Sequence, residues 1–171
     1  MKWYAISGTW KTITKEAEKD VQEIVKNIVS RGDGIITGGA LGVDSVAVQT
    51  VLELGNVKKQ LRLYLPINLD DLIEHFFRRA SEGVITKEQA DEVTAQWKKV
   101  AEICPECIKD DWGFKEANQE SYYARNTKII EDCDVLYAFQ VNDSPGTQDA
   151  INKAKSLGKQ VIVKKYKINP S

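Results

Sequence analysis

The sequence is poor in cysteine and histidine, which narrows the kinds of site that it can build. Three cysteines in 171 residues are an odd number and do not form a disulfide framework, which fits a reducing compartment. Cys104 and Cys107 have C-x-x-C spacing, but a zinc site needs two more ligands, and only Cys133 and His75 are left, each far along the chain. We expect no metal and no other cofactor, and we interpret the pair as two small, partly buried residues at a helix end.

Long apolar runs and an excess of charge of one sign are also missing. No stretch approaches the length of a membrane span, and residues 1–6 resemble a strand rather than a signal peptide, so we expect a cytoplasmic protein with no membrane partner. The 24 basic and 25 acidic residues give a net charge of −1, which supplies no global field to recruit nucleic acid. A nucleic-acid partner is therefore not expected, although this balance still permits a local basic groove.

The remaining sequence alternates between strand and helix patterns. The expected strands cover residues 2–7, 34–37, 61–66, 134–139 and 160–165. The expected helices cover residues 14–31, 45–54, 70–81, 86–104, 119–131 and the segment from the 144–147 turn to 157. Because crossovers between parallel strands are right-handed, this order predicts an α/β fold, a Rossmann-like doubly wound parallel sheet of about five strands.

The alternation is interrupted between residues 68 and 118, after the third strand. This stretch carries two helical patterns but is too short and too charged to build a core of its own. We therefore expect one domain, residues 1–171, with a helical insertion at about 68–118. The insertion is a candidate surface for a homo-oligomer.

Two segments repeat one arrangement, in which an apolar strand leads into a glycine turn and then a helix. The first turn contains Gly38, Gly39 and Gly42, and the second contains Gly146. Where such a turn begins a helix, unpaired N–H groups and the helix dipole point at one spot, and missing Cβ atoms let an anion approach. Both turns follow parallel strands and should share one edge of the sheet. Together they predict a phosphate site, whereas one turn alone is explained by tight chain geometry.

Further ligand contacts are expected from residues near the same edge, namely Ser7, Gly8, Trp10, Asp44, Asn126, Ser144 and Thr147. Several of them have a second interpretation. Trp10 either stacks on a base or covers the core, and Asp44 either contacts a ribose hydroxyl or simply suits the first turn of its helix. The Thr147 hydroxyl either donates to a phosphate or caps its helix. Asn126 either contacts a base or ribose edge or caps a local turn.

Arg125 is the side chain whose loss should be most informative. A guanidinium binds a phosphate through two parallel hydrogen bonds, and the helical pattern around Arg125 places it near the ligand edge. The alternative is a surface salt bridge with Glu120 or Glu131, which contributes little to stability.

Taken together, these segments resemble the SLOG superfamily of Rossmann-like domains. The resemblance rests on Ser7 and Gly8 after the first strand, the 38–44 run, the 123–130 segment, Asp134 and the 144–147 turn. It covers the core and leaves residues 68–118 unexplained. The superfamily includes DprA DNA-processing proteins, LOG phosphoribohydrolases and nucleotide-sensing modules. It implies a nucleotide or nucleotide-sugar phosphate held across the carboxyl edge of the sheet.

The resemblance implies three functions. The first is a binding or sensor module for a nucleotide or a nucleotide-derived ligand. The second is an N-glycosidase acting on nucleoside monophosphates, in which Arg125 aligns with the LOG arginine. Ala150 stands where LOG enzymes carry a glutamate, and Asp149 is one place early, which turns its side chain by about 100°. Asp149 or Glu120 would then have to stabilise the ribose cation. The third is DprA-type binding of single-stranded DNA, which the charge balance disfavours.

Overall fold

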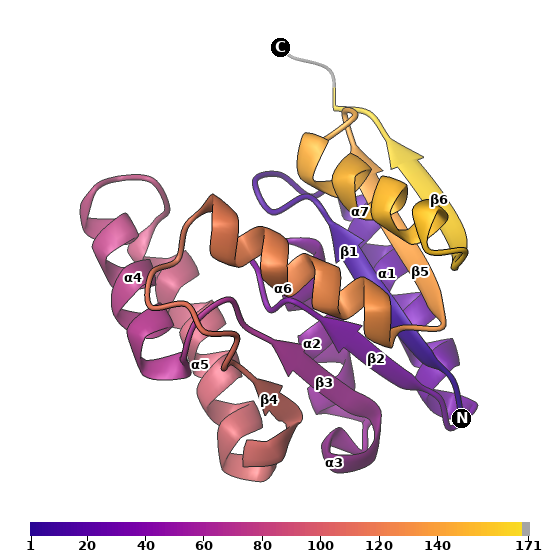
Figure 1. Ribbon diagram of the computed structural model, residues 1–171, viewed down its shortest axis with the longest axis horizontal. Helices are drawn as coiled ribbons and strands as arrows, with labels where there is room; N and C mark the ends of the chain where they lie inside the picture. The colour runs from indigo at the N-terminus through magenta and orange to yellow at the C-terminus, as the bar shows by residue number, and fades with distance from the viewer. Residues whose placement is uncertain (169–171) are drawn as a thin grey trace.

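The computed structural model describes residues 1–168 and contains one six-stranded sheet in the order β4-β3-β2-β1-β5-β6 (Figure 1). The strands are β1 (Trp3–Gly8), β2 (Gly34–Thr37), β3 (Leu61–Tyr64), β4 (Ile108–Lys109), β5 (Val135–Val141) and β6 (Gln160–Tyr166). Every neighbouring pair is parallel. The chain moves outward from β1 to β4 and then returns to the other side of β1 as β5. The expected α/β, Rossmann-like, doubly wound fold is confirmed.

Helices cover both faces of the sheet. They are α1 (Lys15–Ser30), α2 (Val43–Leu54), α3 (Val57–Gln60), α4 (Leu69–Ser81), α5 (Lys87–Ile103), α6 (Gln119–Asp132) and α7 (Pro145–Ser156). Buried side chains of α1, α2 and α5 share one core cluster, and those of α6 and α7 share a second one on the opposite face. Figure 1 shows α6 and α7 in front of the sheet and α1 and α2 behind it. Within residues 1–168, no helix has the length and apolarity needed to cross a bilayer.

The segment expected to be a purely helical insertion also joins the sheet. After α5 the chain forms β4, whose Ile108 and Lys109 pair with Leu63 and Tyr64 of β3. The sheet therefore has six strands rather than about five. A strand of two residues is too short to show alternation in the sequence. The four-residue helix α3 is likewise too short to show a helical period, and the sequence did not predict it.

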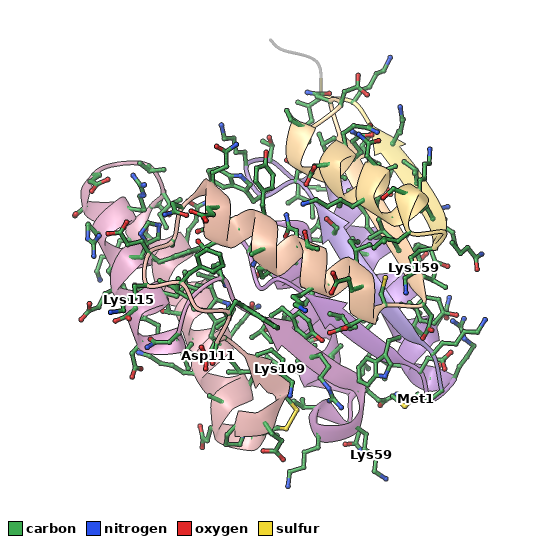
Figure 2. The ribbon with its side chains drawn as sticks, in the orientation of Figure 1. Met1, Lys59, Lys109, Asp111, Lys115 and Lys159 are labelled. Carbon is green, nitrogen blue, oxygen red and sulfur yellow. A yellow bond between two sulfur atoms is a disulfide. The ribbon has the colours of Figure 1, made fainter. Side chains whose placement is uncertain are left out.

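The two cysteines at the end of α5 are bonded to each other, which the sequence interpretation did not anticipate. A short 3₁₀ turn, Pro105–Cys107, brings the Cα atoms of Cys104 and Cys107 to 5.4 Å, within disulfide range. Both residues are buried, and Figure 2 shows the yellow sulfur–sulfur bond on the side of the molecule where Lys59 is labelled. The cysteines thus give no support to the argument for a reducing compartment, and the cytoplasmic location stays a prediction.

Candidate ligand-binding site

A cavity of about 530 Å³ lies at the carboxyl edge of the sheet, a volume typical of small-molecule sites. Its wall is built by the loop after β1, the glycine turn after β2, the insertion, α6 and the first turn of α7. Six of the residues expected at the site belong to this wall: Trp10, Gly38, Gly39, Arg125, Asn126 and Gly146. The structure therefore brings both glycine turns and Arg125 to one cavity.

The first glycine turn is held by protein side chains. Arg125 Nη1 donates a hydrogen bond of 2.7 Å to the carbonyl oxygen of Gly38, and Trp97 Nε1 donates one of 2.9 Å to that of Gly39. A Cβ atom on Gly38 would lie 2.7 Å from Arg125 Nη1, and one on Gly39 would lie 2.8 Å from Trp97 Nε1. The space freed by these glycines is thus filled by Arg125 and Trp97, whereas the sequence interpretation had assigned it to an anion.

Asp44 stabilises the same turn through a hydrogen bond to its backbone. Its side chain is 7% exposed, and Oδ2 accepts a hydrogen bond of 3.2 Å from the Ala40 N–H. Burial raises the pKa of Asp44 from 3.8 to about 6, and this effect is opposed by the positive charge of Arg125 and by the hydrogen bond from Ala40. Asp44 does not line the cavity, so its position fits the structural interpretation better than a ribose contact.

The raised pKa makes stability depend on pH. The folded state binds the Asp44 proton more tightly than the unfolded chain does. Protonation of Asp44 therefore adds to the free energy of unfolding at low pH, and this stabilisation is lost as pH rises through about 6. Asp44 alone should make the protein about 1.4 kcal/mol more stable at pH 5 than at pH 7.5. Urea unfolding at the two pH values measures the difference. Asp44→Asn should remove it, while Asp91→Asn, at an exposed position on α5, should keep it; an unchanged pH dependence in Asp44→Asn would contradict the assignment.

Arg125 is a buried cation at the cavity wall. Its side chain is 6% exposed. Besides Gly38, Nη1 donates to the Tyr64 carbonyl at 3.2 Å, and Nε donates to Asn126 Oδ1 at 3.0 Å. The guanidinium carbon lies 5.3 Å from the centre of the Tyr122 ring. Within residues 1–168, Nη2 has no hydrogen-bond partner, which leaves it available to a ligand.

The alternative of a surface salt bridge for Arg125 is wrong. Glu131 pairs with Lys128 at 3.3 Å, and Glu120 is exposed in the first turn of α6. Burial lowers the pKa of Arg125, and the negative charge of Asp44 opposes that change. The charge of Arg125 is therefore balanced within the site and not at the surface.

The second glycine turn leaves open space. Gly146 lies in the first turn of α7, and a Cβ atom placed there would meet nothing within 4 Å. Thr147 is buried outside the cavity wall, and its hydroxyl donates to Ser144 Oγ at 3.4 Å. The N-terminal end of α7 at Gly146 is the part of the predicted phosphate site that the protein leaves unfilled.

The remaining expected residues lie outside the cavity wall. These are Ser7, Gly8, Gly42, Asp44, Glu120, Ser144, Thr147 and Asp149. Gly8 and Gly42 serve packing, because a Cβ atom would lie 2.4 Å from the Val43 side chain at Gly8 and 2.4 Å from the Thr9 carbonyl at Gly42. Asp149 pairs with Lys153 at 2.9 Å. Within the described residues, neither Asp nor Glu lines the cavity, and no group of His, Cys, Asp and Glu side chains suits a metal ion.

Sequence reasoning missed the wall that the insertion supplies. Leu72, His75 and Phe76 of α4, together with Trp97 of α5, also line the cavity. The aromatic and apolar spacing of α4 was the available signal, but the same spacing is typical of a helix that packs on a core.

Comparisons with known proteins support the fold. No family model and no curated protein matches the sequence. Among solved structures, DNA processing protein A from Helicobacter pylori, described for its single-stranded DNA binding mode, aligns at a TM-score of 0.65 and 21% identity over 95% of this chain. The chain spans 64% of that protein's length.

Two further structures align comparably. The molybdenum cofactor carrier protein from Chlamydomonas reinhardtii gives a TM-score of 0.58 at 19% identity, covering 95% of this chain and 75% of that one. The structural-genomics target TM1055 gives 0.56 at 17% identity, covering 94% and 72%. These likenesses support the fold expected from the sequence, and the chain has a Rossmann-like α/β fold.

Proposed function

We propose that this chain binds a phosphate-bearing small molecule of the nucleotide class and acts as a binding or sensor module. The observation that carries the proposal is that Arg125, the open turn at Gly146 and a set of aromatic side chains meet in one cavity whose described wall has no carboxylate. A phosphate is attracted by the guanidinium and by the helix N-terminus. A planar ring is suited to the aromatic side chains.

The surroundings of the cavity add positive charge. Lys11 lies 5.4 Å from the centre of the Trp10 ring, and Lys153 lies 4.8 Å from that of Tyr123. Trp10 and Tyr123 both line the cavity. Lys153 is paired with Asp149, so Lys11 is the cation that adds charge here, and its ammonium group favours an anionic ligand.

The N-glycosidase alternative is less well supported. Breaking an N-glycosidic bond needs a group that stabilises positive charge on the ribose or transfers a proton. Glu120 and Asp149, the two carboxylates considered for this role, are outside the cavity wall. Arg125 alone can hold a phosphate but cannot stabilise a developing cation.

Single-stranded DNA is a second candidate ligand, because a structural neighbour is described for binding it. Cations interleaved with aromatic side chains are also what a single strand requires. The proposal favours a small molecule because the cavity, at about 530 Å³, has the volume of a small-molecule site.

The test is a calorimetric titration of the protein with inorganic phosphate, adenosine and guanosine 5′-monophosphates, and a single-stranded oligonucleotide. Gly146→Leu places a side chain in the open space at Gly146 in the cavity and should weaken monophosphate binding roughly tenfold or more, a change of about 1.4 kcal/mol. Asn152→Leu, at an exposed position of the same helix, should leave the affinity unchanged.

Three outcomes contradict the proposal. One is the absence of binding to any of the phosphate compounds, and another is equal affinity in Gly146→Leu and the unmodified protein. The third is tighter binding of the oligonucleotide than of the monophosphates, with a steep loss at higher salt, which would support DNA binding instead. Free base released from a monophosphate, measured by chromatography, would support the N-glycosidase.

A further inference from the structure

The cavity is lined by two chemically different groups of residues. Arg125 of α6 and Gly146 of α7 suit an anion. The insertion contributes an apolar and aromatic wall that includes Leu72, Phe76 and Ile85. A ligand that is polar throughout, such as a sugar phosphate, would leave this second wall facing hydroxyl groups and would gain nothing from its burial.

The aromatic part of this wall is rigidly packed. The Phe76 ring meets the buried indole of Trp97 edge to face, with centroids 4.8 Å apart and an interplanar angle of 76°. Trp97 in turn donates its hydrogen bond to Gly39. Phe76 is therefore held against a side chain that is itself fixed to the glycine turn, so the wall is largely formed before a ligand arrives.

Exposed apolar side chains gather around the same cavity. Of the seven exposed large hydrophobic residues in the described part of the chain, three line it: Trp10 at 42%, Val84 at 52% and Tyr123 at 44% exposure. They come from three separate elements, namely the loop after β1, the loop after α4, and α6. Apolar surface concentrated at a cavity marks a binding site, whereas scattered single residues do not.

His75 brings a polar but uncharged side chain to this wall. Burial and the neighbouring charges of Arg79 and Arg78 lower the pKa of His75, so its ring is neutral at pH 7 and can donate or accept one hydrogen bond at the edge of a heterocycle. Arg79 also lines the cavity, and its charge is paired with Glu82 at 3.1 Å. His75 therefore offers a hydrogen-bonding partner to an uncharged ring.

We infer that the insertion forms a subsite for an uncharged planar ring, walled by Phe76 and His75 and bordered by Trp10, and that the ligand is a nucleotide-like phosphomonoester rather than a sugar phosphate. The inference rests on the proposed function, because it assigns the phosphate end of the ligand to Arg125 and Gly146. It assigns recognition of the ring to α4, the part of the chain that the superfamily resemblance leaves unexplained.

The experiment compares adenosine 5′-monophosphate with ribose 5-phosphate, which share the phosphate and the sugar but not the ring. The unmodified protein should bind the nucleotide roughly tenfold tighter or more. Phe76→Leu keeps an apolar side chain but removes the planar ring, and it should bring the ratio close to one without changing the affinity for ribose 5-phosphate. Phe77→Leu, at the adjacent α4 residue outside the cavity wall, is the matched control and should keep the ratio.

His75 gives a readout that does not depend on a variant. It is the sole histidine of the chain, so its ring resonances are assigned without ambiguity in a proton–carbon NMR spectrum. Adenosine 5′-monophosphate should shift them through the ring current of the base, and ribose 5-phosphate should not. Equal affinities for the two compounds, or nucleotide binding that leaves the His75 resonances unmoved, would overturn the ring subsite while leaving phosphate binding intact. Failure of both compounds to bind would overturn the proposed function and the subsite together.

Discussion

Arg125→Met should lower the free energy of unfolding by roughly 3 to 5 kcal/mol. Methionine fills much of the same volume, but the substitution removes the positive charge that stabilises the buried Asp44 carboxylate. It also leaves the carbonyl oxygens of Gly38 and Tyr64 without the hydrogen bonds that Nη1 donates. The loss is large because the partners of Arg125 stay buried after the guanidinium has gone. Urea unfolding followed by circular dichroism measures it.

A double variant separates the charge from the hydrogen bonds. Arg125→Met combined with Asp44→Asn removes both charges, so it should be more stable than Arg125→Met alone by roughly 1 to 3 kcal/mol. Arg78→Met, at an exposed position of α4 outside the cavity wall, should change stability by less than about 0.5 kcal/mol. A loss below about 1 kcal/mol in Arg125→Met would show that Arg125 does not hold the turn.

Gly39→Ala should destabilise the protein by roughly 2 to 5 kcal/mol, from the strained backbone and the overpacked core together. Gly39 has φ of +70°, a conformation that disfavours a side chain. A Cβ atom there would lie 2.8 Å from Trp97 Nε1, 2.9 Å from Leu63 Cδ1 and 3.1 Å from Leu65 Cδ2. None of these three side chains has room to move, because all of them are buried. Thermal unfolding by calorimetry provides the measurement.

The matched control for this substitution is a second glycine in the same cavity. Gly146→Ala adds the same methyl group where nothing lies within 4 Å, so it should stay within about 0.5 kcal/mol of the unmodified protein. If Gly39→Ala were equally mild, the turn would have to accommodate the methyl group by moving away from Trp97. The hydrogen bond from the Trp97 indole to Gly39 would then contribute little to the stability of the fold.

Much of the fold was predictable because it depends on local patterns. The alternation of apolar strands and amphipathic helices placed β2 at 34–37 as observed, and it placed α1 after its Thr14 cap, whose hydroxyl accepts from the Ala17 N–H at 2.9 Å. Elements of two to four residues, such as β4 and α3, carry too few positions for any period to be visible. They form because neighbouring parts of the fold hold them.

Some features of the candidate site were predictable, and others were not because the same residues serve either of two roles. Arg125 and the two glycine turns reach the same cavity, as their order along the chain indicated. The first turn was interpreted less well, because a missing Cβ atom makes room equally for a ligand and for a protein side chain. Which of these fills the space depends on Trp97, 58 residues from Gly39, and on Arg125, 87 residues from Gly38. Pairings at that distance along the chain are set by tertiary packing.

The bond from the Trp97 indole to Gly39 joins the insertion to the rest of the domain. A lobe that only rests on a domain can melt on its own, because the domain is complete without it. Here α5 holds the turn after β2, and β4 extends the sheet next to β3. The insertion and the sheet should therefore lose their structure together, in one cooperative transition.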